Sequence, residues 1–345
     1  MTYAAAGIVA AAAVAAAGCT ALAVHLGLRM RLDRVPVSAV SAVLVAGRGH
    51  STMTALAPGQ SAQLVIVATT SQGRKFATVG AGGGKVLFDS YLLDASVVQV
   101  GRKGEVSLPA DPRWSEGKAG HLRITPVGHP DVVTELDIPV RYDVAYRADF
   151  SGANGAAGAD GTDGEDGAPG SDANMVTDPS TGAQSYQGAG SPGANGGSGG
   201  NGSDGDDGEP GGNVRVSMRL VDGGRPLLQV RAVSGGRESL FLVDPHGGSL
   251  TVLANGGRGG AGGSGGRGGS GGSGGNGSPP GPSGSNGSRG FDGRAGRAGR
   301  AGTITVLVDP GAESYLSCLS YSNHSGNGAP GFAPLIHVEP VGKLW

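Results

Sequence analysis

Residues 255–277 read NGGRGGAGGSGGRGGSGGSGGNG, and this stretch determines how the rest of the chain is interpreted. Glycine occurs at every third position from Gly256 to Gly277, and a second glycine series runs beside it from Gly257 to Gly275. An α-helix repeats about every 3.6 residues and a strand every two, so neither fits a strict period of three. The extended left-handed helix with three residues per turn does fit. We therefore expect an extended rod whose structural glycines are Gly256, Gly259, Gly262, Gly265, Gly268, Gly271, Gly274 and Gly277.

Three more runs share this period and nearly this length. Glycine recurs at spacing three in 152–170, 190–211 and 281–302. At about 3.1 Å per residue, each run would be a rod roughly 55 to 70 Å long. A single rod has no internal hydrogen bonds, so we expect the four to form a bundle in which side-chain-free faces touch. Flexible linkers are the alternative interpretation of each run taken alone.

The two kinds of triplet indicate positions in such a bundle. The GGX triplets of 256–277 leave two smooth faces and favour a central rod, whereas the GXY triplets of 281–302 leave one and favour the outside. Only Ser278, Pro279 and Pro280 separate these two runs, so we expect them to lie antiparallel. The first two runs are acidic and the last two are basic, which suggests that charge fixes which rods adjoin.

Composition narrows the class of protein and divides the chain. The 345 residues include 70 glycines and carry a net charge of −2, so nothing indicates a nucleic-acid partner. The apolar residues concentrate outside the glycine runs. We predict a mainly β protein with a signal or membrane-anchor segment at 1–34, a β-sandwich at 35–150, and a glycine-rich bundle at 151–345 with β-ribbons at 213–254 and 303–345.

The segment from 35 to 150 has the pattern of a β-sandwich. Seven short apolar stretches, among them SAQLVIVATT, HLRITPV and TELDIPVRYDV, are separated by turn sequences such as APGQ and SQGR. In the last stretch Leu136, Ile138 and Val140 alternate with polar residues. This number of short strands, with no helical periodicity, predicts an immunoglobulin-like sandwich.

The N-terminal segment is apolar from Ala4 to Leu28 and long enough to cross a bilayer. Within it, Ala16-Ala17-Gly18-Cys19 resembles the lipobox of bacterial lipoproteins, and this resemblance implies that Cys19 is lipidated. An uncleaved membrane span, an ordinary signal peptide and a buried helix of a soluble protein are the alternatives. The lipoprotein, span and signal interpretations place the protein in a bacterial cell envelope, on the outer surface or in the periplasm.

No set of residues predicts catalysis, so we do not expect an enzyme or a cofactor. The acidic residues of the first two runs could bind Ca²⁺ through oxygen ligands, with Asp160, Asp163, Asp204, Asp206 and Asp207 as candidates. We favour the other interpretation, in which these carboxylates are solvated and pair with the arginines of the last two runs. A carbohydrate-active enzyme on the sandwich is a third possibility, but that segment has few aromatic residues.

The sequence GANGAAGADGTDGEDGAPGSD resembles the collagen-like tracts of bacterial surface proteins. The set of four equal runs is similar to the polyglycine II bundles of glycine-rich insect antifreeze proteins and of some phage tail-tip adhesins. Those resemblances imply a stiff rod bundle used for display or binding, and we expect a monomer rather than a collagen-type trimer. The sequence therefore predicts an exported, membrane-anchored structural or adhesive surface protein with an unidentified partner in the envelope, or alternatively a calcium-dependent binding module.

Overall fold

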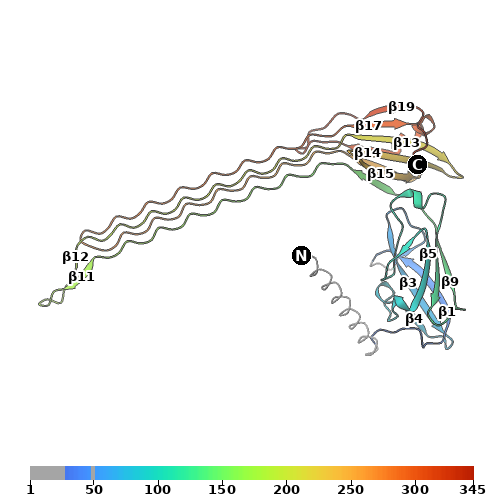
Figure 1. Ribbon diagram of the computed structural model, residues 1–345, viewed down its shortest axis with the longest axis horizontal. Helices are drawn as coiled ribbons and strands as arrows, with labels where there is room; N and C mark the ends of the chain where they lie inside the picture. Colours follow the sequence, from blue (N-terminus) through green and yellow to red (C-terminus); the bar gives the residue numbers. More distant parts are fainter. Residues whose placement is uncertain (1–27, 48–50) are drawn as a thin grey trace, which may run out of the picture.

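The computed structural model describes residues 28–47 and 51–345, and it is mainly β (Figure 1). A sandwich of two sheets stands below a second, smaller pair of sheets, and a long narrow arm extends from that second pair. The N-terminal predictions that concern Cys19 and most of 1–34 lie outside the described residues.

The sandwich confirms the strand-rich interpretation of the first half of the chain. Its larger sheet has the order β2-β1-β3-β7-β6, with β4 also paired to β3, and its smaller sheet has the order β5-β8-β9. The strands are β1 (Val37–Val45), β2 (Thr52–Met53), β3 (Ser61–Thr70), β4 (Lys75–Ala77), β5 (Tyr91–Ser96), β6 (Gln99–Val100), β7 (Glu105–Ser107), β8 (Gly120–Pro126) and β9 (Thr134–Ile138). Three short 3₁₀ helices, η1 (Gly80–Gly82), η2 (Phe88–Ser90) and η3 (Pro112–Trp114), connect them.

Alternation of apolar residues explains the packing of this sandwich. In β3 every second side chain is buried, and Leu64 and Ile66 face the core that Leu122 and Ile124 of β8 approach from the other sheet. Upstream of residue 35, Leu32 is completely buried in the same core and Met30 forms a β-bridge with Val86. The folded part of the chain therefore includes residues before 35.

Two further sheets form what we call the root of the arm. The outgoing sheet has the order β10-β16-β18, and the return sheet has the order β15-β14-β13-β17-β19. Their elements are β10 (Ala145–Asp149), β13 (Val214–Asp222), β14 (Pro226–Ser234), β15 (Arg237–Val243), β16 (Ser249–Leu253), β17 (Ile304–Val308), η4 (Pro310–Cys318), β18 (Leu319–Ser322) and β19 (Leu335–Val338). Strand β10, which the sequence places in the sandwich segment, pairs instead with β16.

One apolar core lies between the outgoing and the return sheets. Leu250 and Val252 of β16 and Val214 and Val216 of β13 belong to it and are nearly or completely buried. Alternate residues of β13 and β17 point into this core, as the period of two requires. The β-ribbons at 213–254 and 303–345 thus supply the apolar burial that the glycine runs lack.

The four glycine runs leave the root as an arm and are bonded to one another at every third residue. The first run follows β10 outward, the second returns into β13, the third follows β16 outward and the fourth returns into β17. Backbone N–H groups of the first run donate to carbonyl oxygens of the third, from Gly152 to Asn255 through Ala173 to Asn276. Equivalent series join the second run to the first and fourth, the third to the second, and the fourth to the third.

These bonds fix the cross-section of the arm. The second and third runs each contact three others, whereas the first and fourth each contact two, so 256–277 is central as the sequence predicts. The third and fourth runs are antiparallel, which confirms the expected reversal at 278–280. The first and third runs are parallel to each other, as are the second and fourth, so the arm mixes both orientations.

Contact geometry explains both glycine series of the third run. A Cβ atom on Gly265 or its period-three equivalents from 256 to 274 would collide with backbone of the fourth run. A Cβ atom on Gly266 or its equivalents would collide with carbonyl groups of the first run, in this case that of Thr162. Gly277 meets the second run, at Gly190. Each glycine face therefore touches the backbone of a different rod.

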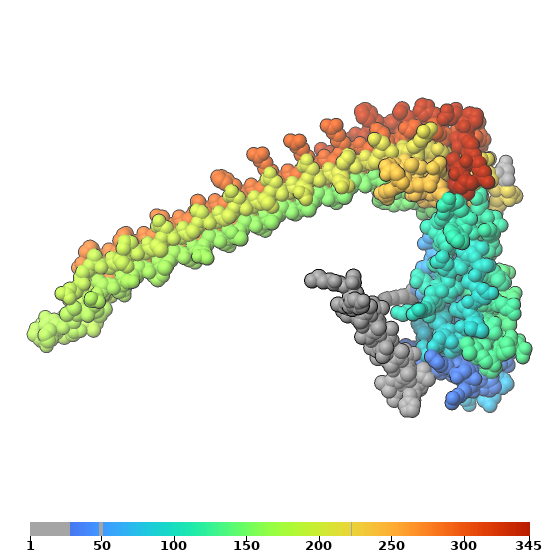
Figure 2. Space-filling model, viewed as in Figure 1, coloured from blue at the N-terminus to red at the C-terminus, as the bar shows by residue number. Residues whose placement is uncertain are grey.

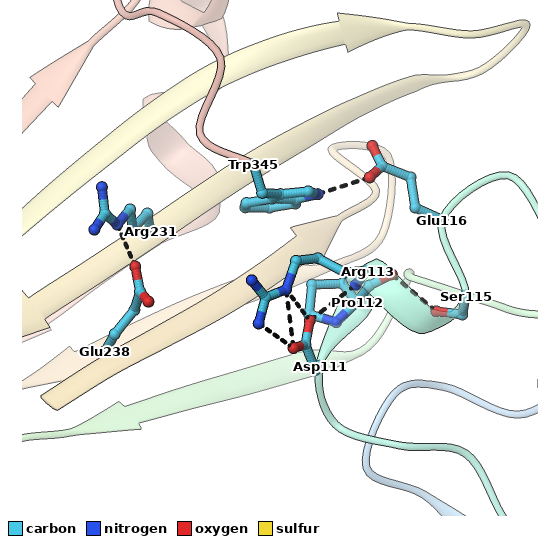
Figure 3. A network of polar contacts seen from close by, with 8 residues as sticks. All are labelled: Asp111, Pro112, Arg113, Ser115, Glu116, Arg231, Glu238 and Trp345. Carbon is cyan, nitrogen blue, oxygen red and sulfur yellow. Dashed lines mark hydrogen bonds and ion pairs between the residues drawn. The ribbon is translucent and has the colours of Figure 1, made fainter.

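A small polar network joins the sandwich to the root (Figure 3). Glu116, just after η3, accepts from Trp345 Nε1 at 2.7 Å. It also accepts from Gln229 Nε2 of β14 at 2.9 Å. Beside it, Asp111 accepts from the guanidinium of Arg113, and Arg231 pairs with Glu238 on the neighbouring strands. Glu116 of the sandwich segment is thus bonded both to β14 of the root and to Trp345.

We expect Gly266→Ala to destabilise the arm, because the new methyl group would collide with the backbone of the first run at Gly161 and Thr162, where there is no flexible side chain to displace. Overpacking of this kind costs about 1–3 kcal/mol. The matched control is Ser264→Ala, two residues away on the exposed face of the same run. Thermal unfolding should show a lower transition for the glycine variant alone, and equal melting of both variants would contradict the close rod contact.

Candidate functional site

The side chains of the arm lie in rows, because the rods repeat every three residues: a GGX triplet contributes one row and a GXY triplet two. Asn and Asp occur repeatedly two residues after a glycine in the first and second runs. In the structure their Oδ1 atoms accept hydrogen bonds from backbone N–H groups of the parallel neighbour. These side-chain hydrogen bonds add to the backbone hydrogen bonds that join the rods across their glycine faces.

The first run contacts the third in this way. Asp163 accepts from the N–H of Arg267 at 2.7 Å, and Asp160 accepts from that of Ser264 at 2.7 Å. The other members of this row are Asn154, Asp166 and Asp172. Every one of these bonds joins residues 104 apart.

The second run contacts the fourth by the same rule. Asp204 accepts from the N–H of Arg294 at 2.6 Å, and Asp207 from that of Arg297 at 2.5 Å. Asn195, Asn201 and Asn213 continue the row, and every bond joins residues 90 apart.

The same sequence separations between bonded residues occur in the strand pairs of the root. In the outgoing sheet Ala145 pairs with Ser249, again 104 residues apart, and in the return sheet Val214 pairs with Ile304, 90 apart. The register of each parallel strand pair therefore continues without a slip into the rods. The buried root core sets the register, and the Asn and Asp rows carry it along the arm.

The five carboxylates proposed for calcium are placed differently from that expectation. Asp160, Asp163, Asp204 and Asp207 each accept a backbone N–H, while Asp206 makes no such side-chain bond with any residue in 28–47 or 51–345. Members of one row recur about every 9.3 Å, too far apart to share an ion that binds its oxygen ligands at about 2.4 Å. Among the residues that the structure describes, no three His, Cys, Asp or Glu side chains could hold a metal ion.

The expected pairing of aspartates with arginines is also corrected. Acidic runs do lie beside basic ones, but the aspartate contacts the backbone N–H of the arginine and not its guanidinium. Within the described part of the arm, the ion pair is Arg289 with Asp292, 2.7 Å apart on the same run. The sequence predicts that these residues act as charges, whereas the interchange of Asn with Asp at the same spacing indicates an oxygen acceptor.

Asp292 of the fourth run is an acidic residue of the arm whose pKa lies below its ordinary value. It accepts from the N–H of Gly265 at 2.7 Å, and this bond, followed by the bond from Arg289, lowers its pKa. Asn286 makes the equivalent contact with Gly271. The fourth run thus reaches back to the third through the same kind of acceptor.

The arm ends in a hairpin of β11 (Asn174–Thr177) and β12 (Gln184–Gln187), which we call the tip (Figure 1). Met175 pairs with Tyr186, and Met175 and Val176 are about half exposed. Asp178 begins the turn by accepting from the N–H and the hydroxyl of Ser180. The tip is the part of the arm farthest from the sandwich, and it carries apolar side chains in the open.

Comparisons of this chain with protein-family models, with curated proteins and with solved structures gave no match.

Asp163→Ala and Asp163→Asn should show whether the aspartates of this row act as charges or as hydrogen-bond acceptors. The alanine variant removes the acceptor for Arg267 and should lose about 0.5–1 kcal/mol of unfolding free energy, whereas asparagine keeps the acceptor and should lose little. Urea unfolding measures both. If asparagine were as destabilising as alanine, charge and not hydrogen bonding would be the function of this row.

Acid should weaken the arm at Asp292. Because its pKa is lowered in the folded state, the ionised carboxylate stabilises the fold above the unfolded-state pKa, and this stabilisation is lost as pH falls through the lower folded value. We expect the melting temperature of the wild type to fall more between about pH 5 and pH 2 than that of Asp292→Asn, which does not titrate. Parallel pH profiles of the two proteins would contradict this role.

Proposed function

We propose that the four runs form a polyglycine II bundle and that the protein is a stiff display or binding module. The observation that carries this proposal is the unbroken series of backbone hydrogen bonds at every third residue, in one register, from the root to the tip. Rods without such bonds would be flexible chains. Cross-bonded rods hold the tip at a fixed distance of roughly 55 to 70 Å from the root.

The rods of this single chain form their backbone hydrogen bonds with one another, which supports a monomer over a collagen-type trimer. In a collagen trimer the partners of each glycine-rich strand come from other chains. Here the partners of the first run, for example, are the second and third runs of the same chain. The likeness to collagen-like surface proteins is then one of composition, and the likeness to polyglycine II adhesins is one of architecture.

The lobe below the root is compatible with an immunoglobulin-like sandwich, and we propose that it is a spacer or mounting domain for the arm. Two antiparallel sheets packed over one core support this assignment. We further propose export to a bacterial envelope and anchoring through the N-terminal segment, by Cys19 or by a span. Among the described residues no helix is long and apolar enough to cross a membrane.

A display role requires that the length of the arm be set by the number of triplets. We expect that deleting nine residues from all four runs at one level (160–168, 194–202, 264–272 and 284–292) will shorten the arm by about 28 Å and leave it folded. These deletions keep the period of three and the partners on either side of the gap in each run. Small-angle scattering gives the maximum dimension, and circular dichroism gives the melting transition.

The control is the deletion of 264–272 from the third run alone. It removes fewer residues but shifts every bond beyond the gap, so it should abolish cooperative melting of the arm. If the single deletion were tolerated as well as the matched one, or if the matched deletion did not shorten the particle, the runs would be linkers and the display proposal would be wrong.

A further inference from the structure

The fourth run carries a regularly spaced row of large side chains that the architecture of the arm does not need. Arg294, Arg297 and Arg300 occupy the same position in three successive triplets, directly after a glycine, and all three are exposed. We call these three residues the arginine row. Side chains from this part of the chain, coloured orange, project along one edge of the arm in Figure 2.

The backbone of the arginine row is fixed. The carbonyl groups of its three residues accept from Gly205, Gly208 and Gly211 of the second run, each at 2.8 or 2.9 Å. The N–H groups of Arg294 and Arg297 donate to Asp204 and Asp207. Any residue except proline could make these bonds, so the bundle itself does not explain three arginines.

The guanidinium groups are available for a ligand. Arg31, Arg113, Arg141, Arg147, Arg231 and Arg289 each form an ion pair with a carboxylate. Across the described part of the chain, no carboxylate oxygen lies within 4.0 Å of a guanidinium of the arginine row. The nearby carboxylates of Asp204 and Asp207 are held at the rod surface by the backbone of the same arginines.

An aromatic ring continues the row toward the tip. Phe291 precedes Arg294 by one triplet, and its side chain is 79% exposed although its N–H is bonded to Asn201. The equivalent positions before it are Ser285 and Ser288. Ala295 and Ala298 form the other side-chain row of this part of the fourth run, and both are small and exposed.

The geometry points to a linear acidic polysaccharide as the ligand of this edge, bound along the arginine row with one sugar ring against Phe291. The row repeats about every 9.3 Å, which is close to the length of one disaccharide in an extended glycan. Guanidinium groups bind carboxylates through paired hydrogen bonds, and an aromatic face binds the C–H face of a sugar. In DNA the charges of one strand follow about every 3.4 Å along the axis, a poorer fit to this spacing.

This inference goes beyond the display role, because the row lies on the side of the arm and not at its tip. It rests on the regular spacing and the exposure of these side chains of the fourth run. A polymer lying along this edge would contact the arm at several regularly spaced points, so binding should be weak for short fragments and should strengthen with length.

The test compares two double variants of the full chain that lose the same charge. Arg294→Gln with Arg297→Gln removes adjacent members of the row, whereas Arg258→Gln with Arg267→Gln removes two exposed arginines of the third run that lie three triplets apart. In both variants each substituted residue donates its N–H to an Asn or Asp of a neighbouring run. The backbone role is therefore matched.

The probe is hyaluronan, which has one carboxylate per disaccharide, with uncharged dextran and a single-stranded oligo(dT) as comparison polymers. We expect binding of hyaluronan by calorimetry at low salt, a loss of about tenfold in the row variant, and a loss of less than about twofold in the third-run variant. Phe291→Ala should weaken hyaluronan binding several-fold and leave the melting temperature unchanged. Dextran should not bind.

Three outcomes would overturn the inference. They are absence of hyaluronan binding, equal losses in the two double variants, and tighter binding of oligo(dT) than of hyaluronan. None of them bears on the length of the arm, so failure here is distinguishable from failure of the display proposal, which the matched deletions test.

Discussion

The arm depends on one interaction, the hydrogen bond between backbone N–H and C=O groups across faces that carry no side chain. A rod of this kind has no hydrogen bonds of its own, and each glycine loses more conformational freedom on ordering than any other residue. What offsets this cost is repetition, since each run shares bonds with at least two others at every third residue. A methyl group on any of these faces would separate two backbones, which is why the glycine period is strict.

The arm has almost no apolar core, so its register must be set elsewhere. The outgoing and return sheets bury Leu250, Val216 and Val306 between them and hold each parallel pair of strands in one alignment. That alignment continues into the rods as the constant separations of 104 and 90 residues. Apolar burial thus acts at the root, while polar bonding acts along the arm, and neither alone would specify the structure.

Much of this architecture could be predicted from the sequence, because the features that determine it are local. The period of three indicated rods, the two smooth faces of 256–277 indicated a central position, and the short connection at 278–280 indicated a reversal. The seven short apolar stretches predicted the sandwich, and the alternation of Leu136, Ile138 and Val140 with polar residues predicted its last strand, β9, which ends at Ile138.

The remainder could not be predicted, because it depends on contacts between distant segments. That the first and third runs are parallel follows from the pairing of β10 with β16, and nothing in the sequence AYRAD distinguishes β10 from a sandwich strand. The aspartates were interpreted as charges because their partners are backbone groups of another run. Only the known register shows that Asp163 meets the N–H of Arg267.

The segment after β18 repeats the plan of the arm on a smaller scale. Residues from His324 to Gly326 leave the outgoing sheet beside the third and fourth runs, where the N–H of Gly326 donates to Gly299, and the chain then reverses and enters β19. Asn255 accepts the N–H of His324 with the separation of 69 residues that β16 and β18 share. The molecule is therefore a stack of three outward-and-return units, of which the last is a stub. Growth of that stub by whole triplets would thicken the arm without disturbing the existing rods. The bending stiffness of a beam rises steeply with its thickness. Such a fold can therefore gain rigidity when the single loop between β18 and β19 is lengthened.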